Sequence, residues 1–218
     1  MNKKKLFLVT YVILLYSFTS AQSKYSIEGS LGVISPINSS AGLLVSGQLN
    51  YSLTNAVQLF SNALYGSWDK YNVYYHYEYY TSEHPDTGPF KTFTADDHSL
   101  VSINLGSRFL LHENKIVNLL FDTQIGLSFL SFNKYRLNQV VNQETGQIDF
   151  VPDVISPLKI NETLLSFGVG PVFERKINSL FSLYLSAKLN TMINAGDTDF
   201  ISKRGTYFIV SAGFTHMI

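Results

Sequence analysis

The stretch Gly205-Thr-Tyr-Phe-Ile-Val-Ser-Ala-Gly-Phe-Thr-His-Met-Ile218 decides the fold of this chain. Its apolar side chains recur at every second position, which predicts a β-strand, because successive side chains of a strand point to opposite faces. One face of this strand carries Phe208, Val210, Ala212, Phe214, His216 and Ile218. A long apolar strand at the edge of an open sheet would promote aggregation. We therefore expect this strand to close a barrel by pairing with the first strand of the chain.

The first 21 residues have the features of a secretory signal peptide. Three lysines at 3–5 precede an apolar run at 6–16, and small residues at 19–21 offer a cleavage site. The apolar run is too short for a transmembrane helix, and an uncleaved N-terminal anchor is the alternative. We predict that residues 1–21 are removed and that residues 22–218 form one barrel domain.

The composition excludes several classes of protein. The chain has 16 basic and 16 acidic residues and no Cys. Without the three lysines of the predicted signal peptide, 13 basic residues stand against 16 acidic ones, and no basic patch suggests nucleic acid. The absence of Cys excludes a disulfide scaffold and a lipid-modified cysteine at the cleavage site. After residue 21 no apolar run approaches 18 residues, so only a closed barrel could span a membrane.

Eight stretches of the chain alternate between apolar and polar side chains. They are residues 24–34, 43–53, 56–68, 98–110, 117–132, 163–174, 180–191 and 205–218. Three short turns alternate with four longer connections, so a periplasmic N-terminus places every short turn in the periplasm and every longer connection outside. The pattern predicts an all-β fold, an eight-stranded antiparallel up-and-down transmembrane β-barrel. Pro171 is the awkward residue, because proline cannot donate to a strand ladder.

Two long connections, at about 69–97 and 133–162, are predicted to be extracellular loops. The first is rich in tyrosine, whose flat ring and hydroxyl group suit a recognition surface. The candidate binding surface consists of Trp68, Tyr71, Tyr74, Tyr75, Tyr77, Tyr79 and Tyr80. The alternative is that the tyrosine run extends two strands above the membrane as a rigid hairpin without a ligand.

Most predicted strands have one face of Leu, Phe, Val and Ile and another of small polar residues with an occasional charge. Side chains just fill an eight-stranded barrel, so we predict the apolar faces outside and the small polar faces inside. Charged groups in that interior should pair, because isolated buried charges are costly. The predicted interior polar network consists of Glu28, Gln48, Asn104, Arg108, Asp122, Gln124, Lys188 and Asn190. We interpret it as a filling that sets strand register, and a gated polar path is the alternative.

Aromatic residues near the strand ends are expected at the two membrane interfaces. They are Tyr25, Tyr51, Tyr65, Trp68, Phe132, Phe173, Tyr207 and Phe214. For each of them, ordinary β-propensity is the alternative explanation.

On these features the chain resembles the bacterial outer-membrane β-barrel family with eight strands, the OmpA-like and OmpX-like barrels. The resemblance rests on the signal segment, on Tyr51-Ser-Leu-Thr-Asn55 and on the terminal strand 207–218, and it covers the mature chain by pattern. It implies a location in the bacterial outer membrane, surrounded by lipid, and recognition of the C-terminal strand by the barrel-assembly machinery. His216 and Ile218 depart from the family's terminal pattern, which usually ends in an aromatic residue.

Three kinds of function are compatible with such a barrel. The first is a structural or surface-interaction protein that binds an extracellular ligand or protein through its loops, and this is the one we expect. The second is a narrow pore, against which the small interior argues. The third is a lipid-modifying enzyme. If the protein were not inserted in a membrane, a secreted lipocalin-like carrier of small ligands would be the alternative.

The enzyme hypothesis has a small set of candidate residues around the first long connection. They are His76, Glu78, His84, Asp96, Asp97, His98 and Ser99. Their spacing matches no known nucleophile arrangement, and a divalent metal held by the same residues is a weak alternative. We expect no enzymatic activity, no cofactor and no nucleic-acid partner.

Overall fold

The computed structural model describes residues 24–37, 39–69, 72–76, 91–141, 143–144, 146, 148–193 and 206–218, so the predicted signal peptide lies outside the described residues. The strands are β1 (Tyr25–Pro36), β2 (Gly42–Ser52), β3 (Val57–Trp68), β4 (Asn72–His76), β5 (Lys91–His112), β6 (Asn118–Val141), β7 (Ile148–Pro152), β8 (Leu158–Lys176), β9 (Phe181–Ile193) and β10 (Thr206–Met217). In these ranges no helix is long and apolar enough to cross a membrane.

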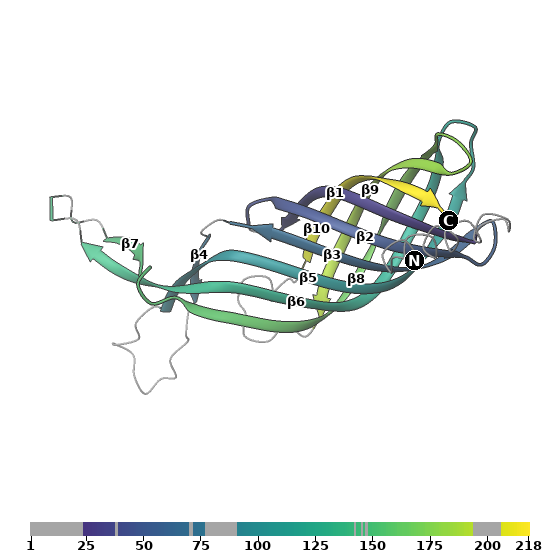
Figure 1. The fold of residues 1–218 in the computed structure, drawn as a ribbon. Coiled ribbons are helices and arrows are strands. Elements are labelled where there is room, and N and C mark those ends of the chain that lie inside the picture. Colours follow the sequence, from purple (N-terminus) through teal and green to yellow (C-terminus); the bar gives the residue numbers. More distant parts are fainter. Residues whose placement is uncertain are drawn as a thin grey trace, which may run out of the picture.

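Eight of the strands form a closed antiparallel barrel (Figure 1). They follow the order β5-β3-β2-β1-β10-β9-β8-β6, and pairing between β5 and β6 closes the circle. The terminal strand pairs with β1, with Val210 opposite Val33 and Ala212 opposite Leu31, as the sequence predicts. The short strands β4 and β7 add to β5 and β6 beyond the closed part. The predicted eight-stranded up-and-down barrel is confirmed.

The two ends of the barrel differ in their connections. Short turns join β2 to β3, β5 to β6 and β8 to β9, all at the end where β1 begins and β10 stops. Backbone hydrogen bonds close them tightly: Leu53 N donates to Val57 O at 3.0 Å, and Ile177 N donates to Phe181 O at 2.9 Å. Short periplasmic turns are typical of outer-membrane barrels, so this end is periplasmic and the opposite end extracellular.

Three strands continue beyond the barrel on the extracellular side (Figure 1). β5 has 22 residues, β6 has 24 and β8 has 19, compared with 12 in β1. Parts of both segments predicted as loops are therefore β-structure, with β4 paired to the start of β5 and β7 to the end of β6. Above the membrane both faces of a sheet meet water, so the apolar alternation that reveals a strand is lost there.

Pro171 lies inside β8, where the ladder adapts to it. On one side it lies opposite Phe121 in the pairing with β6. On the other side the pairing with β9 is interrupted between Val169 and Val172. A Cβ atom on the neighbouring Gly170 would overlap the carbonyl oxygen of Ala187. The lack of a side chain at position 170 therefore lets the two backbones approach where proline has removed a donor.

The outward face of the barrel carries a belt of exposed apolar side chains. On β5, Val101, Ile103, Leu105 and Phe109 are 39–64% exposed. A transmembrane β-strand crosses the hydrocarbon core with about 9–11 residues, and the span from 101 to 109 has that length. Such a surface requires lipid around it, because an exposed apolar surface of this size is not stable in water. The predicted orientation, with apolar side chains outside, is confirmed.

The interior has three layers along the barrel axis, two apolar and one polar. A buried apolar cluster fills the extracellular half. It consists of Ile34, Leu44, Leu64, Trp68, Ala95, Leu100, Leu130, Phe132, Leu164, Met192, Tyr207 and Ile209. Polar side chains fill the middle layer, and a smaller apolar cluster of Leu120, Val172 and Tyr184 lies toward the periplasmic end. The prediction of a polar interior is therefore confirmed for the middle of the barrel and wrong for its extracellular half.

Candidate functional site

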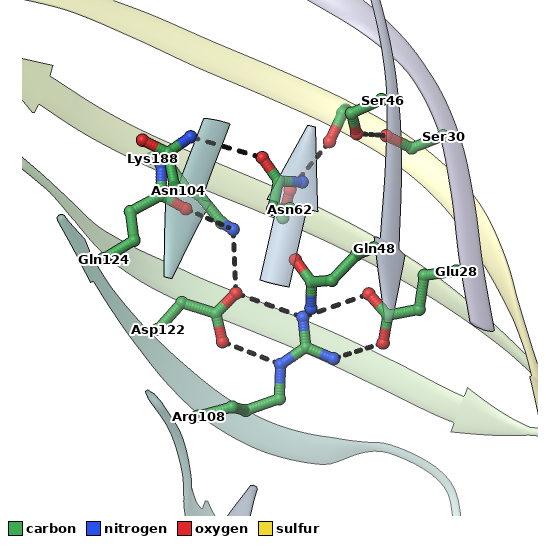
Figure 2. A network of polar contacts seen from close by, with 12 residues as sticks. Glu28, Ser30, Ser46, Gln48, Asn62, Asn104, Arg108, Asp122, Gln124 and Lys188 are labelled. Atoms are coloured by element: carbon green, nitrogen blue, oxygen red, sulfur yellow. Dashed lines mark hydrogen bonds and ion pairs between the residues drawn. The ribbon is translucent and has the colours of Figure 1, made fainter. Parts of the chain in front are cut away.

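Arg108 is the centre of the interior polar network (Figure 2). It points inward from β5, opposite Asp122 on β6. Its Nε donates to Asp122 Oδ1 at 2.7 Å and its Nη2 to Oδ2 at 3.1 Å. On its other side Nη2 donates to Glu28 Oε2 at 3.2 Å, and Nη1 pairs with Glu28 Oε1. The guanidinium therefore makes two bidentate ion pairs, and all three side chains are buried.

Lys188 extends the network to β9. Its Nζ lies 2.8 Å from Asp122 Oδ2 and 3.4 Å from Gln124 Oε1. Two bases thus balance two acids, which leaves this layer without net charge. The ring of Phe60 lies beside both cations, with its centroid 5.3 Å from Lys188 Nζ and 5.9 Å from Arg108 Cζ. These cation–π contacts add to the ion pairs that both cations make.

Neutral side chains complete the hydrogen bonding of Glu28. Its Oε1 accepts from Asn50 Nδ2 at 2.9 Å and from Thr215 Oγ1 at 3.3 Å. Gln48 reaches the charged groups through Asn50, to whose Oδ1 its Nε2 donates at 2.7 Å. Asn50 and Thr215 were not predicted as members of the network. The signal was present, because Asn50 faces inward two residues after Gln48.

The other two predicted members lie further from the charges. Asn190 Oδ1 accepts from Gln124 Nε2 at 3.0 Å. Asn104 donates to Asn62 Oδ1 at 3.4 Å and accepts from Ser166 Oγ at 3.1 Å. The structure therefore brings all eight predicted residues into the barrel interior, six of them in the cluster around the charges. Asn62 was missed because the two faces of its strand are poorly separated in the sequence.

A cavity of about 20 Å³ lies between the polar layer and the apolar cluster, which is room for about one water molecule. Polar groups line much of it, among them Glu28, Gln48, Gln124 and Lys188. A space of this size offers no passage to an ion with its hydration shell. The arrangement therefore favours a filled interior over an open channel.

Three aromatic rings stack at the extracellular end of the interior. His98 lies between Trp68 and Phe132, with ring centroids 5.0 Å and 5.4 Å apart and interplanar angles of 9° and 19°. A β-bulge in β5 precedes His98, and Asp97 within it has a φ of 52°. Trp68 is 2% exposed, Phe132 3% and Tyr207 1%. Trp68 therefore does not belong to an exposed loop surface, and neither Trp68 nor Phe132 nor Tyr207 lies in the aromatic belts predicted at the membrane interfaces.

The rest of the predicted tyrosine surface falls largely outside the described part of the chain. Tyr74 and Tyr75 lie in β4, whose backbone pairs with β5 as the rigid-hairpin alternative expects. Tyr71, Tyr77, Tyr79 and Tyr80 lie outside the described residues. A tyrosine-rich binding surface stays a prediction.

The residues of the enzyme hypothesis do not form a catalytic pair where they are described. His98 is buried inside the barrel, whereas Ser99 follows it in the same strand and faces outward. A nucleophile and its base need to lie within hydrogen-bond reach of one another. His76 lies in β4, and Glu78 and His84 lie outside the described residues.

An acidic cluster borders the aromatic stack. Asp69, Asp96 and Asp97 each have a carboxylate oxygen within 4.8 Å of the other two. Asn133 Nδ2 donates to Asp97 Oδ2 at 2.8 Å. Exposed acidic groups commonly gather without an ion, so this arrangement by itself assigns no metal site.

The extracellular extension exposes apolar side chains to water. Val140 and Val141 end β6 and are 49% and 58% exposed. The segment between β7 and β8 carries two more, of which Val154 is 62% and Ile155 89% exposed. These side chains lie well beyond the lipid-facing belt. Large exposed apolar patches are typical of interaction sites, so these side chains are candidates for part of one.

Comparison with solved structures shows the same fold in bacterial outer-membrane proteins. Neisserial surface protein A (NspA) aligns with 90% of this chain and 98% of its own, at 13% identity and a TM-score of 0.52. A major outer membrane protein from Thermus thermophilus aligns with 88% of this chain and 97% of its own, at 12% identity and a TM-score of 0.53. The outer membrane protease OmpT from Escherichia coli aligns less well, at 12% identity and a TM-score of 0.46. No family model and no curated protein matches the sequence.

A shared fold at this level of identity establishes architecture and not activity. The closed barrel, its apolar belt and its short periplasmic turns are those of a bacterial outer-membrane barrel, which confirms the predicted location. The function has to be argued from the residues that this chain places inside the barrel and above the membrane.

Proposed function

We propose that this protein is a surface-interaction barrel of the outer membrane, in which a closed, filled barrel holds an extracellular β-sheet for binding another protein or a surface. The observation that carries the proposal is the extension of β5, β6 and β8 beyond the barrel, together with its exposed apolar side chains. Neither feature is needed to cross the membrane, because the apolar belt and the closed ladder already achieve that.

The chemistry of the extension supports a role in binding. An isolated hairpin that served only as a spacer would be expected to carry polar groups on both faces. Here Val154 and Ile155, between β7 and β8, have most of their surface exposed. Burial of apolar surface is the main favourable contribution in most protein associations. We infer that a partner covers these side chains when it binds.

The filled interior of the barrel also supports a role in binding, because it supports the strands that continue into the extension. Four buried charges pair within one layer, and an apolar cluster lies above them. We infer that this filling fixes the register of the strands, so that the extension is held rigidly. A rigid presenting element loses less conformational entropy when it binds a partner.

The test is a double substitution, Val154→Ser with Ile155→Ser, in cells that display the protein on their surface. Attachment is measured to bare polystyrene and to surfaces coated with collagen, fibronectin or a mixed serum-protein film. We expect attachment to at least one surface to fall to the level of cells without the protein. The amount of folded barrel is checked by the mobility difference between boiled and unboiled samples.

A matched control uses the same chemistry at the other end of the barrel. Ile116 and Ile177 lie in periplasmic turns with 66% and 55% exposure, so Ile116→Ser with Ile177→Ser should leave attachment unchanged. Equal attachment by cells with and without the wild-type protein on every surface would contradict the proposed function.

A further inference from the structure

The β-bulge in β5 lies at the level where the extension leaves the barrel. On its barrel side, Ser99 lies opposite Ser131 in the closed ladder with β6. On its other side, Asp96 lies opposite Asn133 and belongs to the part of β5 whose neighbours are β4 and the outer end of β6. A bulge bends its strand and increases the local twist. The bulge therefore sets the angle between the extension and the barrel.

The bulge contains one residue more than the strand beside it. Asp97 and His98 of β5 stand opposite a single residue of β6, Phe132. His98 faces the interior and lies opposite Trp68 of β3, whereas Asp97 is exposed and has a φ of 52°. Asp enters this left-handed region more readily than most residues. Since one residue is in excess, His98 can turn out of the interior while the pairs on both sides of the bulge are kept.

The ring of His98 is held in surroundings that suit its neutral form. It is buried between Trp68 and Phe132, and both of these belong to the apolar cluster of the interior. Burial lowers the pKa of His98 to about 4, although a hydrogen bond to the backbone of Trp68 and the charge of Asp97 raise it. An imidazolium ion is therefore unfavourable in the stack, even between two aromatic faces.

Three carboxylates lie beside the stack, and two of them, Asp69 and Asp97, are exposed to water. Asp69 follows Trp68 directly, and Asp96 and Asp97 precede His98. Negative charge nearby favours the protonated form of a histidine. A His98 ring that carries a proton is therefore more stable outside the stack, next to these acids.

Other ionisable groups come from three of the strands around the stack. They are Lys134 on β6, Lys159 and Glu162 on β8, and Tyr207 on β10. Among the described residues, β1, β2 and β9 contribute apolar side chains to the cluster at this level, namely Ile34, Leu44 and Met192. Lysine stays charged and tyrosine stays neutral throughout the acidic range. Acidification therefore changes the charge of His98 and of the carboxylates, and the experiment has to separate these two.

We propose that His98 and the bulge at Asp97 form an acid-sensitive hinge between the barrel and its extension. The neutral ring in the stack holds the bulge in the form described above. When the ring takes up a proton from solvent, it leaves the stack toward the three carboxylates, and the extension changes its angle to the barrel. The hinge thereby regulates the presentation of the extension, a consequence that rests on the proposed function.

The experiment measures the distance between the barrel and the extension as the pH falls. The chain has no Cys, so two spin labels can be placed at chosen sites. Leu43→Cys labels the outward face of β2, where the side chain is 76% exposed, and Asn138→Cys labels an exposed position of β6 in the extension. Pulsed electron paramagnetic resonance on the refolded barrel gives the distance distribution. We expect a second distance population to appear with a midpoint near pH 4, and to be absent when the labelled protein also carries His98→Gln.

Two further variants make the result specific. Asp97→Asn removes a charge that raises the pKa of His98, so the midpoint should move to lower pH. His112→Gln removes an exposed histidine at the periplasmic end of β5 and should leave the titration unchanged. Gel mobility before and after boiling checks barrel closure at each pH. A single distance population at every pH, or a titration that persists in His98→Gln, would overturn the hinge.

Attachment of cells that display the protein tests the regulatory consequence separately. The wild type should lose attachment as the pH falls through about 4, whereas His98→Gln should keep it. If the distances respond and no surface is bound at any pH, the hinge stands and the proposed function fails. If both proteins lose attachment equally, the regulatory role of the hinge is overturned.

Discussion

At the scale of single residues, Arg108 is the side chain that links the two buried carboxylates of the polar layer. Glu28 and Asp122 lie on opposite sides of its guanidinium, and each makes two contacts with it. Lys188 can neutralise only Asp122, from which it lies 2.8 Å away. Removal of Arg108 would therefore leave Glu28 as a buried carboxylate without a cation. For a buried ion pair, removing one partner destabilises the protein by more than the intact pair stabilises it, because the remaining charge stays buried without compensation.

We expect Arg108→Met to lower the free energy of unfolding by about 3–5 kcal/mol, the usual cost of an uncompensated buried charge. Guanidinium-induced unfolding of the barrel in lipid vesicles, followed by gel mobility, measures this change. Arg175→Met is the control, because Arg175 is an exposed arginine at the periplasmic end of β8, and it should change stability by less than about 0.5 kcal/mol. A loss below about 1 kcal/mol for Arg108→Met would contradict the assigned role.

His98 predicts a response of the extracellular mouth to acid. It lies beyond the lipid belt, since its outward neighbours in β5 are polar. Burial lowers the pKa of His98 from 6.5 to about 4, against the opposing effects of a hydrogen bond to the backbone of Trp68 and the charge of Asp97. The pKa in the folded state is thus below the unfolded value. The stability that the neutral ring contributes is complete above pH 6.5 and is lost as the pH falls toward 4.

The single tryptophan of the chain, Trp68, reports this change directly, because it stacks on His98. We expect the emission of Trp68 to change with a midpoint near pH 4 and to stay flat in His98→Gln. A midpoint near pH 6.5 would show that the ring is solvated. An unchanged titration in His98→Gln would assign the signal to the neighbouring acidic cluster instead.

At the scale of elements, the sequence predicted the features that the lipid environment requires, namely the positions of the strands and the faces that they turn outward. Within the lipid belt one face of each strand has to be apolar, so the period of two locates the strands and assigns their faces. The same reasoning placed Glu28, Arg108, Asp122 and Lys188 inside and implied that these charges pair with one another, with the choice of partners left open. It could not give the height of each side chain along the barrel axis, because the alternation of apolar and polar residues is the same at every position along a strand.

The remaining errors concern the face of single aromatic residues and the structure above the membrane. Trp68 and Phe132 are aromatic residues near strand ends, which suits a membrane interface, yet both lie in the apolar cluster of the interior. β7 was not predicted, and β4 was foreseen only by the rigid-hairpin alternative, because strands above the membrane need no apolar face. The bulge before His98, which turns its ring into the stack, has no marker in the sequence, since Asp97 is not a glycine.

The extension should be separable from the barrel. β7 pairs with β6 alone among the described strands, and the pairing between β5 and β6 within the belt does not involve it. We expect that replacing residues 137–157 by a short Asn-Gly turn leaves closure intact and shifts the melting temperature by only a few degrees. Gel mobility and a thermal melt in detergent measure both. Failure of the shortened chain to close would show that the extension takes part in folding.

At the scale of the whole molecule, the layers of the interior decide between a presenting barrel and a pore. An ion that crossed the barrel would have to pass an apolar cluster and then a layer in which every charge is already paired. The cavity between these layers holds about one water molecule, far less than a hydrated ion requires. Eight-stranded barrels have interiors that side chains just fill, whereas aqueous channels need more strands.

We therefore expect the wild-type barrel to show no steady conductance in a planar bilayer at physiological salt. Leu100→Ala with Leu130→Ala should remain silent as well, because it thins the apolar cluster and leaves the paired layer below it intact. Adding Arg108→Met to those two changes breaks the apolar cluster and the polar layer and leaves only the small periplasmic cluster of Leu120, Val172 and Tyr184, so of the three proteins this triple variant should be the one that gives open steps. Single-channel recordings of the three proteins at matched insertion test the order. Steps from the wild-type barrel would mean that the two layers move apart in the membrane, and the interior would then be a gate instead of a filling.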